Sequence, residues 1–495
     1  MRILIFLLFI PVNVFAYPFE TGDDGVFYIS SGEQLAKIQG MASQYIETGG
    51  VLGSLEFLTN PDMRYVLTNN IRLPDGWQPI GDSDKSSRFV FRGSFDGGGF
   101  EIYGLDIDDE FGITQGLFGR VEGGEIRNLV LRNSNIKVRG DYGNREFAVG
   151  ILAGEVANSV ITNIQIINGN INSTAPDGGI GVVGGLVGKA VDSDISYVRL
   201  KNIRLAENKK LRAMGGLAGY LHNSNITLSR FTAGEIFSSA EAVGGFVGVS
   251  YGSEFLSCGV NFTVINAETY TAGGFVGHVK ERGVFENNHS SACINARVAG
   301  GFAGKISGEN RYNVEFVNNT ARGQVVSEYW AGGFAGVSAY AVIKNSGAYV
   351  DVAATEGGAG GFVGRLAGRG LVVDSYAMGN VAGLAGYVGG FVGEITNSSR
   401  IESSKAAGIV SGGCATGGFV GVISAIGVPN TISDSKTISP LVSGTGDVRR
   451  FAGRTDHDGV NGCFAYLGTV VITNGRIQHV IPSGFGEDGA DVKAT

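Results

Sequence analysis

Residues 244–248 read GGFVG, and the same five letters return at 273–277, 360–364, 389–393 and 417–421. They belong to a wider unit in which two glycines precede two apolar residues and a final glycine. That final glycine lies at Gly188, Gly219, Gly248, Gly277, Gly304, Gly336, Gly364, Gly393 and Gly421. Weaker copies end at Gly119, Gly154 and Gly453, so twelve copies follow one another at spacings of 27 to 35 residues. A recurring period of about this length is the signature of a stacked repeat protein.

The segments between the copies alternate β-branched or apolar residues with polar ones. Clear examples are VVDSYAMGNV (372–381), IRNLVLRNSNI (126–136) and ITNIQIINGNI (161–171). This alternation predicts short strands bounded by Gly, Asn and Ser turns. A single rung cannot bury its own apolar side, so we predict an all-β fold, a right-handed parallel β-helix of about twelve rungs. At ~4.8 Å per step, such a stack would be about 53 Å long.

One position of the unit carries a column of large apolar residues. It reads Leu117, Leu152, Leu186, Leu217, Phe246, Phe275, Phe302, Phe334, Phe362, Phe391, Phe419 and Phe451. Stacked rings and buried area would stabilise such a column. The next position is nearly always Val or Ala, although neighbours on a strand point to opposite faces. Either both faces of this strand are covered, or the chain bends there.

The unit and the segment that follows it resemble the GLUG-motif repeat family. The lead-in stretches YVLTNNIRL (65–73), WQPIG (77–81) and FRGSFDGGG (91–99) strengthen the resemblance, which spans about 27 to 465. The family occurs in bacterial surface and secreted proteins, including large adhesins and non-catalytic parts of IgA-cleaving metallopeptidases. The resemblance implies a β-helical scaffold outside the cell. It supplies no catalytic residue, and the chain has no HExxH motif.

The first sixteen residues, MRILIFLLFIPVNVFA, have the pattern of a secretory signal peptide. The apolar run is too short to span a bilayer, and glycine and polar residues interrupt every later candidate for a transmembrane segment. We therefore expect a secreted or cell-surface protein. The expected layout is a cap and lead-in strands at 17–115, repeats at 116–465, and a C-terminal cap and tail at 466–495.

Residues 30–45 carry the clearest helical pattern near the N-terminus. Ser30 and Glu33 have the spacing of a capping box, and Leu35, Ile38, Met41 and Tyr45 suggest one apolar face. Because the open end of a β-helix offers unpaired edges, we expect this helix to cover it.

The chain has four cysteines and no CxxC pair or zinc-binding spacing. Cys258 and Cys463 fall where other repeats place Ser346, Ser375, Ser404 or Ser435, so a small, weakly polar residue is all that this place requires. The two lie about seven rungs apart and cannot pair with each other. Whether Cys293 or Cys414 forms a disulfide stays open.

No motif in the sequence indicates a cofactor or metal. GIGVVG (179–184) matches a dinucleotide fingerprint, but it leads into another rung and not into a helix. GGLVGKA (184–190) lacks the residues that a phosphate-binding loop requires. Acidic groups fit solvated turns better than catalytic pairs. They are Asp106, Asp108, Asp109 and Glu110; Asp82 with Asp84; and Asp456 with Asp458 around His457.

Charge and aromatic content limit the classes of partner that the protein can bind. A net charge of −8 disfavours a nucleic-acid partner. Tyr329 and Trp330 lie just before a repeat unit, where they could bind a sugar or simply pack a corner, and packing is favoured. Trp77 is expected in the core.

Taken together, the sequence favours an exported, non-enzymatic scaffold that presents an extended surface for adhesion to a host or bacterial surface protein or glycan. Two alternatives remain: a polysaccharide-degrading enzyme on the same β-helix, and a non-catalytic module of a secreted protease system.

Overall fold

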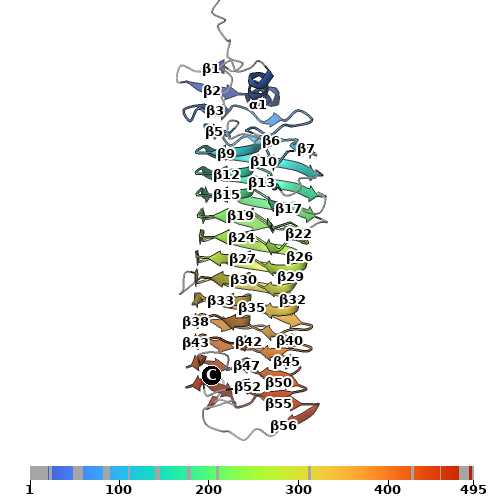
Figure 1. Ribbon diagram of the computed structural model, residues 1–495, viewed down its shortest axis with the longest axis vertical. Helices are drawn as coiled ribbons and strands as arrows, with labels where there is room; N and C mark the ends of the chain where they lie inside the picture. The colour runs from blue at the N-terminus through green and yellow to red at the C-terminus, as the bar shows by residue number, and fades with distance from the viewer. Residues whose placement is uncertain are drawn as a thin grey trace, which may run out of the picture.

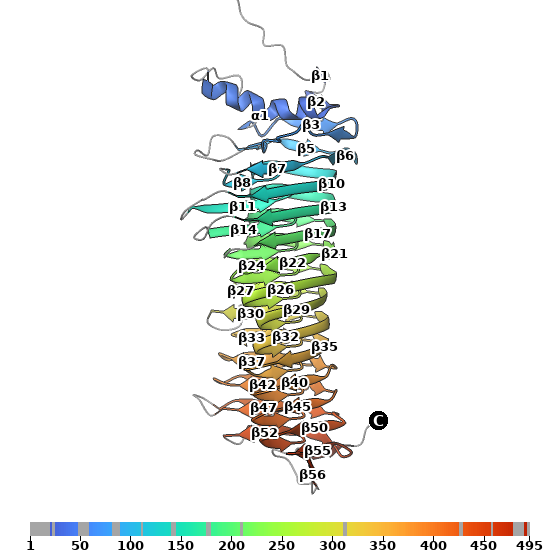
Figure 2. The ribbon, with the colours of Figure 1, turned by 90° about the vertical axis from the view of Figure 1, so that its right-hand side faces the viewer.

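The computed structural model describes residues 20–21, 25–47, 59–81, 90–109, 112–139, 145–174, 180–207, 211–309, 314–424, 429–456, 459–478 and 490–492. Short strands are piled along one long axis, with helix α1 (Gly32–Glu47) at the N-terminal end (Figures 1 and 2). The predicted all-β parallel β-helix is confirmed. The predicted signal segment, residues 1–16, lies outside the described residues. Within the described part of the chain, no helix is both long and apolar enough to cross a membrane.

The repeat units account for one complete sheet of the molecule. Every unit starts a strand of this sheet directly after its large apolar residue, and the sheet has twelve strands. They are β9 (Phe118–Glu122), β12 (Ala153–Ala157), β15 (Val187–Val191), β19 (Ala218–His222), β24 (Val247–Tyr251), β27 (Val276–Glu281), β30 (Ala303–Gly308), β33 (Ala335–Ala339), β37 (Val363–Ala367), β42 (Val392–Ile395), β47 (Val420–Ile423) and β52 (Ala452–Thr455). The predicted number of rungs is therefore correct.

One rung illustrates the path of the chain. β25 (Glu254–Leu256) is followed by β26 (Gly259–Gly273), and a bend then leads into β27. Each strand pairs in parallel with its equivalent in the next rung: β25 with β28 (Gly283–Glu286), β26 with β29 (His289–Gly300), and β27 with β30. Residues roughly one repeat apart in sequence thus become direct neighbours, and in-register columns run along the molecule.

The lead-in segment already belongs to the stack. β2 (Val26–Ile29) pairs in parallel with β3 (Arg64–Leu67), β3 with β5 (Ser94–Asp96), and β5 with β10 (Glu125–Val138). The predicted strand at 126–136 lies within β10, and the one at 161–171 lies within β13 (Val160–Ser173). The lead-in residues therefore build the N-terminal rungs on which the repeats stack.

The apolar column of the repeat forms the predicted ladder in the core. From Phe246 to Phe451 the rings stack nearly parallel, with centroids of successive rings 4.8–5.0 Å apart. Every side chain of the column, including the four leucines, is fully buried. The ring spacing matches the separation of adjacent strands in a sheet, so each rung contributes one ring to a continuous stack.

The chain bends within the repeat unit, which decides between the two explanations left open by the sequence. β23 (Ala242–Gly244) ends at the first glycine of the GGFVG unit, and β24 begins at Val247. Gly245 and Phe246 form the bend between them. Because the strand direction changes there, Phe246 and Val247 both point into the core and both are fully buried.

At two positions of the unit only glycine fits, because a Cβ atom would collide with neighbouring backbone. Neither of these glycines has a positive φ. A Cβ added to Gly248 would lie 2.8 Å from the backbone nitrogen of Met214 and 2.7 Å from the carbonyl oxygen of Gly219. A Cβ on Gly245 would overlap the carbonyl oxygen of Gly274 in the next rung. The unit therefore lets the backbone of one rung approach the backbone of the rungs before and after it.

Buried polar side chains stack at a corner of each rung. The backbone N–H of Ser346 donates to Oγ of Ser375 at 3.3 Å, and that of Ser375 donates to Oγ of Ser404 at 3.3 Å. Cys258 occupies the same column, where its N–H donates to Oδ1 of Asn288 at 2.8 Å. Cys463 ends the column next to Ser435. The prediction that these two cysteines replace serines is confirmed.

Helix α1 covers the N-terminal end of the core, as expected. Leu35 and Ile38 are fully buried, whereas the side chains of Met41 and Tyr45 lie outside the described residues. The predicted capping pair of Ser30 and Glu33 is wrong by one residue. Ser31 Oγ accepts from the N–H of Gln34, and Gln34 Oε1 accepts from the N–H of Ser30. The helix starts at Gly32, which makes Ser31 the capping residue.

Candidate functional site

The acidic groups near residue 106 form ladder contacts and ion pairs. In β7 (Asp106–Asp109), Asp106 accepts a hydrogen bond from Nδ2 of Asn135 at 2.7 Å. Asp108 lies 3.7 Å from Nζ of Lys137 and also pairs with Arg139. All three partners come from the next rung, so these carboxylates stabilise stacking at the surface. The side chain of Asp109 and residue Glu110 lie outside the described residues.

The remaining motifs of enzyme type resolve as parts of rungs. Residues of GIGVVG form β14 (Ile180–Gly184), a strand, and Lys189 pairs with Glu146 at 3.5 Å and Glu155 at 3.8 Å. Asp456 lies 3.8 Å from Arg454, while Asp82, Asp84, His457 and Asp458 lie outside the described residues. No group of three or more His, Cys, Asp or Glu side chains placed to hold a metal occurs in the described part of the chain.

All four cysteines are unpaired in the structure. Cys258 and Cys463 are buried, whereas Cys293 and Cys414 are exposed. The open question of a disulfide at Cys293 or Cys414 is thereby answered for this structure, in which neither bonds to another cysteine.

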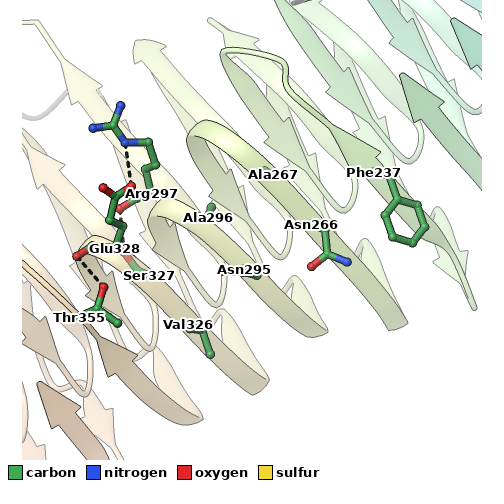
Figure 3. A pocket seen from close by; sticks show the side chains of 10 residues that line it. All are labelled: Phe237, Asn266, Ala267, Asn295, Ala296, Arg297, Val326, Ser327, Glu328 and Thr355. Carbon is green, nitrogen blue, oxygen red and sulfur yellow. Dashed lines mark hydrogen bonds and ion pairs between the residues drawn. The ribbon is translucent and has the colours of Figure 1, made fainter. Parts of the chain in front are cut away.

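A groove with a volume of about 470 Å³ lies on the surface of the middle rungs (Figure 3). We call it the Arg297 groove. Its residues come from consecutive rungs, mainly from β22 (Glu235–Ser238), β26, β29 and β32 (Thr320–Gly332). They are Phe237, Asn266, Ala267, Asn295, Ala296, Arg297, Val326, Ser327, Glu328 and Thr355. Ala267, Ala296 and Ser327 are buried and form the floor.

The register of the strands creates the two sides of the Arg297 groove. Phe237, Asn266, Asn295 and Val326 are successive partners in one column and line one side. Arg297 and Glu328 line the other. Between the two sides, the pairing of β26 with β29 shifts after Ala267, and that of β29 with β32 shifts after Ala296. Such bulges change the direction of the chain. Here they place the side chains that follow the floor residues on the opposite side of the groove, where they form its second wall.

Arg297 is held on two sides. Its Nε donates to Oε2 of Glu328 at 3.0 Å, and its guanidinium lies 4.8 Å from the ring centroid of Tyr329. Hydrogen bonding to Tyr329, with the nearby charge of Glu328, raises the pKa of Arg297 above its usual range. Ser327 Oγ donates to the carbonyl oxygen of Arg297 at 2.8 Å. The charged head group is therefore fixed at the rim of the groove.

A smaller hollow of about 260 Å³ adjoins the groove and shares Arg297 with it. Its other residues are Tyr270, Thr271, Val298, Tyr329 and Trp330. Both sequence candidates, Tyr329 and Trp330, thus line a hollow and are partly exposed. Trp330 also packs: its indole lies directly over Gly358 and 5.6 Å from the guanidinium of Arg365. The expectation of packing therefore holds best for Trp330, while Tyr329 faces Arg297.

Arg297, Tyr270 and the two asparagines were not singled out from the sequence. A signal was present, because AETYTAGG (267–274), NARVAGG (295–301) and SEYWAGG (327–333) align directly before successive repeat units. Aligning them on the GG places Tyr270, Arg297 and Tyr329 in one column. The bulges that open the groove leave no mark of this kind in the sequence.

Comparison with known proteins identifies no family. No protein-family model matches the chain, and no curated protein matches it in sequence. Among solved structures, it is similar to an IgA1 protease (14% identity, TM-score 0.33), with 62% of this chain and 22% of that chain covered. It is also similar to a Bacteroides ovatus protein described as a proposed immunoglobulin A1 protease (13% identity, TM-score 0.25), with 96% of this chain and 87% of that one covered. The chain thus spans about a fifth of the length of the first of these proteins.

Proposed function

We propose that this protein is an exported, non-enzymatic scaffold of the GLUG-repeat type whose Arg297 groove binds a glycan chain. The observation that carries the proposal is the arrangement across the groove. The amides of Asn266 and Asn295 stand in register on one side, opposite the fixed Arg297–Glu328 pair. The ring of Tyr329 lies against Arg297 in the adjoining hollow. The repeat sequence and its N-terminal signal pattern support an extracellular location.

The chemistry of the groove suits a hydroxyl-rich ligand. Each asparagine amide can donate and accept, and the carboxylate and guanidinium add an acceptor and further donors. Exposed aromatic rings offer faces to the C–H surfaces of sugar rings. Since the groove draws on successive rungs, its long direction follows the stack, and a linear chain can lie along it.

Cleavage of the bound chain is a separate possibility with different requirements. Most glycoside hydrolases use two carboxyl groups that flank the scissile bond. Among the groove-lining residues that the structure describes, Glu328 supplies the one carboxylate, and Arg297 holds it. This arrangement favours binding, and the experiment below separates binding from cleavage.

The test is a glycan array probed with the purified chain, followed by affinity measurements on the hits. We expect Asn295→Ala and Tyr329→Ala each to weaken binding about tenfold, the equivalent of ~1.4 kcal/mol. Tyr197→Ala, which removes an exposed tyrosine from another face, is the matched control and should leave affinity unchanged. Release of shorter sugars would support an enzyme instead. Binding to proteins alone, or an equal effect of all three variants, would contradict the proposed site.

A further inference from the structure

A second surface of the solenoid carries a charge opposite to that of the whole protein. Two neighbouring columns of outward-pointing residues run along the stack. One passes through the first residue of β26, β29 and β32, and the other through the residue two places later, each with its equivalents in other rungs. Their cationic members are Arg199, Lys201, Arg230, Arg322, Lys405 and Lys436. We call this surface the basic face. From Arg199 to Lys436, no carboxylate occupies the paired positions of these two columns, although the chain has a net charge of −8.

The basic face departs from the way in which this protein stacks its other charges. Elsewhere, in-register neighbours have opposite sign, as in Arg204 with Glu235 at 3.7 Å and Arg365 with Glu394 at 3.0 Å. On the basic face, Arg199 is the direct partner of Arg230, and Lys405 that of Lys436. Like charges in adjacent positions repel, so this arrangement costs stability that a bound anion would restore.

The cations of the basic face are available to a ligand. Arg199, Lys201, Arg230, Arg322 and Lys405 are exposed, and Lys436 is half-buried. In the part of the chain that the structure describes, none of these six side chains forms an ion pair with a carboxylate. His289 lies in the column between Arg230 and the C-terminal lysines, and burial together with the charges of Arg230 and Arg322 lowers its pKa.

The adjacent face has the opposite character. Its outward columns carry Asp194, Glu254, Glu286, Glu315 and Glu402, and its cations, Lys344 and Arg400, are each paired with a glutamate. On the border of the two faces, Asp374 and Asp434 line a hollow of about 470 Å³ with Lys405, Lys436 and Phe464. The positive surface is thus a stripe with an acidic flank.

We infer that the basic face binds a linear acidic polysaccharide. The stripe is two residues wide, about 7 Å between its columns, and its rows repeat every ~4.8 Å along the axis. Its cations form three groups along the axis: Arg199, Lys201 and Arg230 in adjacent rungs, Arg322 after two rungs without a cation, and Lys405 with Lys436 after two more. One extended chain with many anionic groups can contact all three groups at once, whereas a small anion can contact one. A nucleic acid would bring a denser charge close to the acidic face and to a protein of net negative charge. This inference goes beyond the proposed glycan groove and does not depend on it.

The experiment measures binding of the purified chain to polygalacturonate, to heparin and to single-stranded poly(dT) at low salt. The test variant combines Arg230→Gln, Lys405→Gln and Lys436→Gln. The matched control combines Arg204→Gln, Lys344→Gln and Arg400→Gln, which changes the net charge equally on other faces. Because all six side chains lie at the surface, thermal unfolding should show that both variants fold.

We expect polygalacturonate or heparin to bind and to dissociate as salt is raised, since surface charges are screened. The test variant should lose on the order of tenfold to 100-fold in affinity. The control variant and Tyr329→Ala should keep the affinity of the unaltered chain for these glycans. A failure of the basic face to bind can therefore be told apart from a failure of the Arg297 groove. The inference is overturned if neither glycan binds, if both triple variants lose affinity equally, or if poly(dT) binds more tightly than either glycan.

Discussion

Cys258 shows how little chemistry a single repeat position can require. Its thiol donates to the carbonyl oxygen of Ile226 at 3.4 Å, and its column elsewhere holds serine or asparagine. Burial raises the pKa of the Cys258 thiol to about 12 and that of Cys463 to about 11. Because the thiolate is the reactive form, these two residues serve as small polar fillers and not as nucleophiles.

We predict that the four cysteines separate into two classes in a thiol-labelling experiment. At pH 8, Cys293 and Cys414 should react with an aromatic disulfide reagent within minutes, because both are exposed. Cys258 and Cys463 should react only on unfolding. Cys293→Ser and Cys414→Ser together should abolish the fast reaction. Rapid labelling of that double variant in the native state would contradict the described burial.

The same burial makes stability depend on alkaline pH. The pKa of Cys258 in the folded chain, about 12, exceeds the ordinary value of 9.0. The stability gained by keeping the thiol neutral is therefore complete below pH 9 and is lost as pH rises toward 12, because the unfolded chain ionises first. Denaturant unfolding at pH 8 and pH 10 should show a smaller difference for Cys258→Ser than for the unaltered chain. An equal difference in both proteins would contradict the assignment.

At the scale of the strand, the phenylalanine ladder binds successive rungs together. Phe302 lies 4.8 Å from Phe275 and 5.0 Å from Phe334, and it also meets Phe285 and Phe316 edge to face. We predict that Phe302→Ala lowers the free energy of unfolding by about 3–5 kcal/mol, through lost burial and the cavity that remains. Equilibrium unfolding followed by circular dichroism measures the change.

Phe302→Leu is the informative comparison for the ladder. Leucine fills the same column in the first four repeats, so this variant should cost about 1–2 kcal/mol, clearly less than alanine. Tyr197→Ala, at an exposed corner, should change stability by less than about 0.5 kcal/mol. If Phe302→Ala were no more harmful than Tyr197→Ala, the stacked column would not be a stabilising element.

Elements that depend on the repeat itself were predictable from the sequence. The position of Phe246 and its equivalents follows from counting, as does the place of Cys258 among serines. The bend at Gly245 could not be predicted. The two adjacent apolar residues, Phe246 and Val247, are compatible either with a strand covered on both faces or with a change of direction. The N-terminal cap was displaced by one residue, because Ser30 and Ser31 both offer a hydroxyl and only the helix start decides which caps it.

The candidate site could not be derived from the repeat in the same way. Spacings between copies vary from 27 to 35 residues, and the variation lies in the segments between the units. The Arg297 groove depends on register shifts after Ala267 and Ala296, which move side chains without altering any motif. The basic face likewise depends on the register of many rungs, so Arg230 and Lys405 share a column although 175 residues separate them.

At the scale of the whole molecule, a stack of rungs must end without offering its core to another stack. Helix α1 serves this purpose at the N-terminal end, where it lies across the first strands (Figure 2). Leu35 and Ile38 are buried against the core, and Oε1 of Gln39 accepts from the N–H of Gly81 at 3.0 Å. Below the helix, Phe27 and Tyr65 stack with ring centroids 5.6 Å apart.

We predict that removing this cover makes the chain associate end to end. Leu35→Asp with Ile38→Asp places two carboxylates where apolar side chains are fully buried, so the helix should detach and expose the rings beneath it. Open strand edges and apolar surface then favour end-to-end pairing. Light scattering coupled to gel filtration should show an apparent mass that rises with concentration toward about twice that of the unaltered chain.

The control for this experiment lies on the same helix. Lys37 is exposed on the outer side of α1, so Lys37→Asp introduces a carboxylate without disturbing the buried face. This variant should keep the apparent mass of the unaltered chain at every concentration and unfold at the same temperature as that chain. If the double variant also kept the apparent mass of the unaltered chain while its circular dichroism showed an intact β-helix, helix α1 would not be needed to prevent association. The end of the solenoid would then be protected by its edge strands alone.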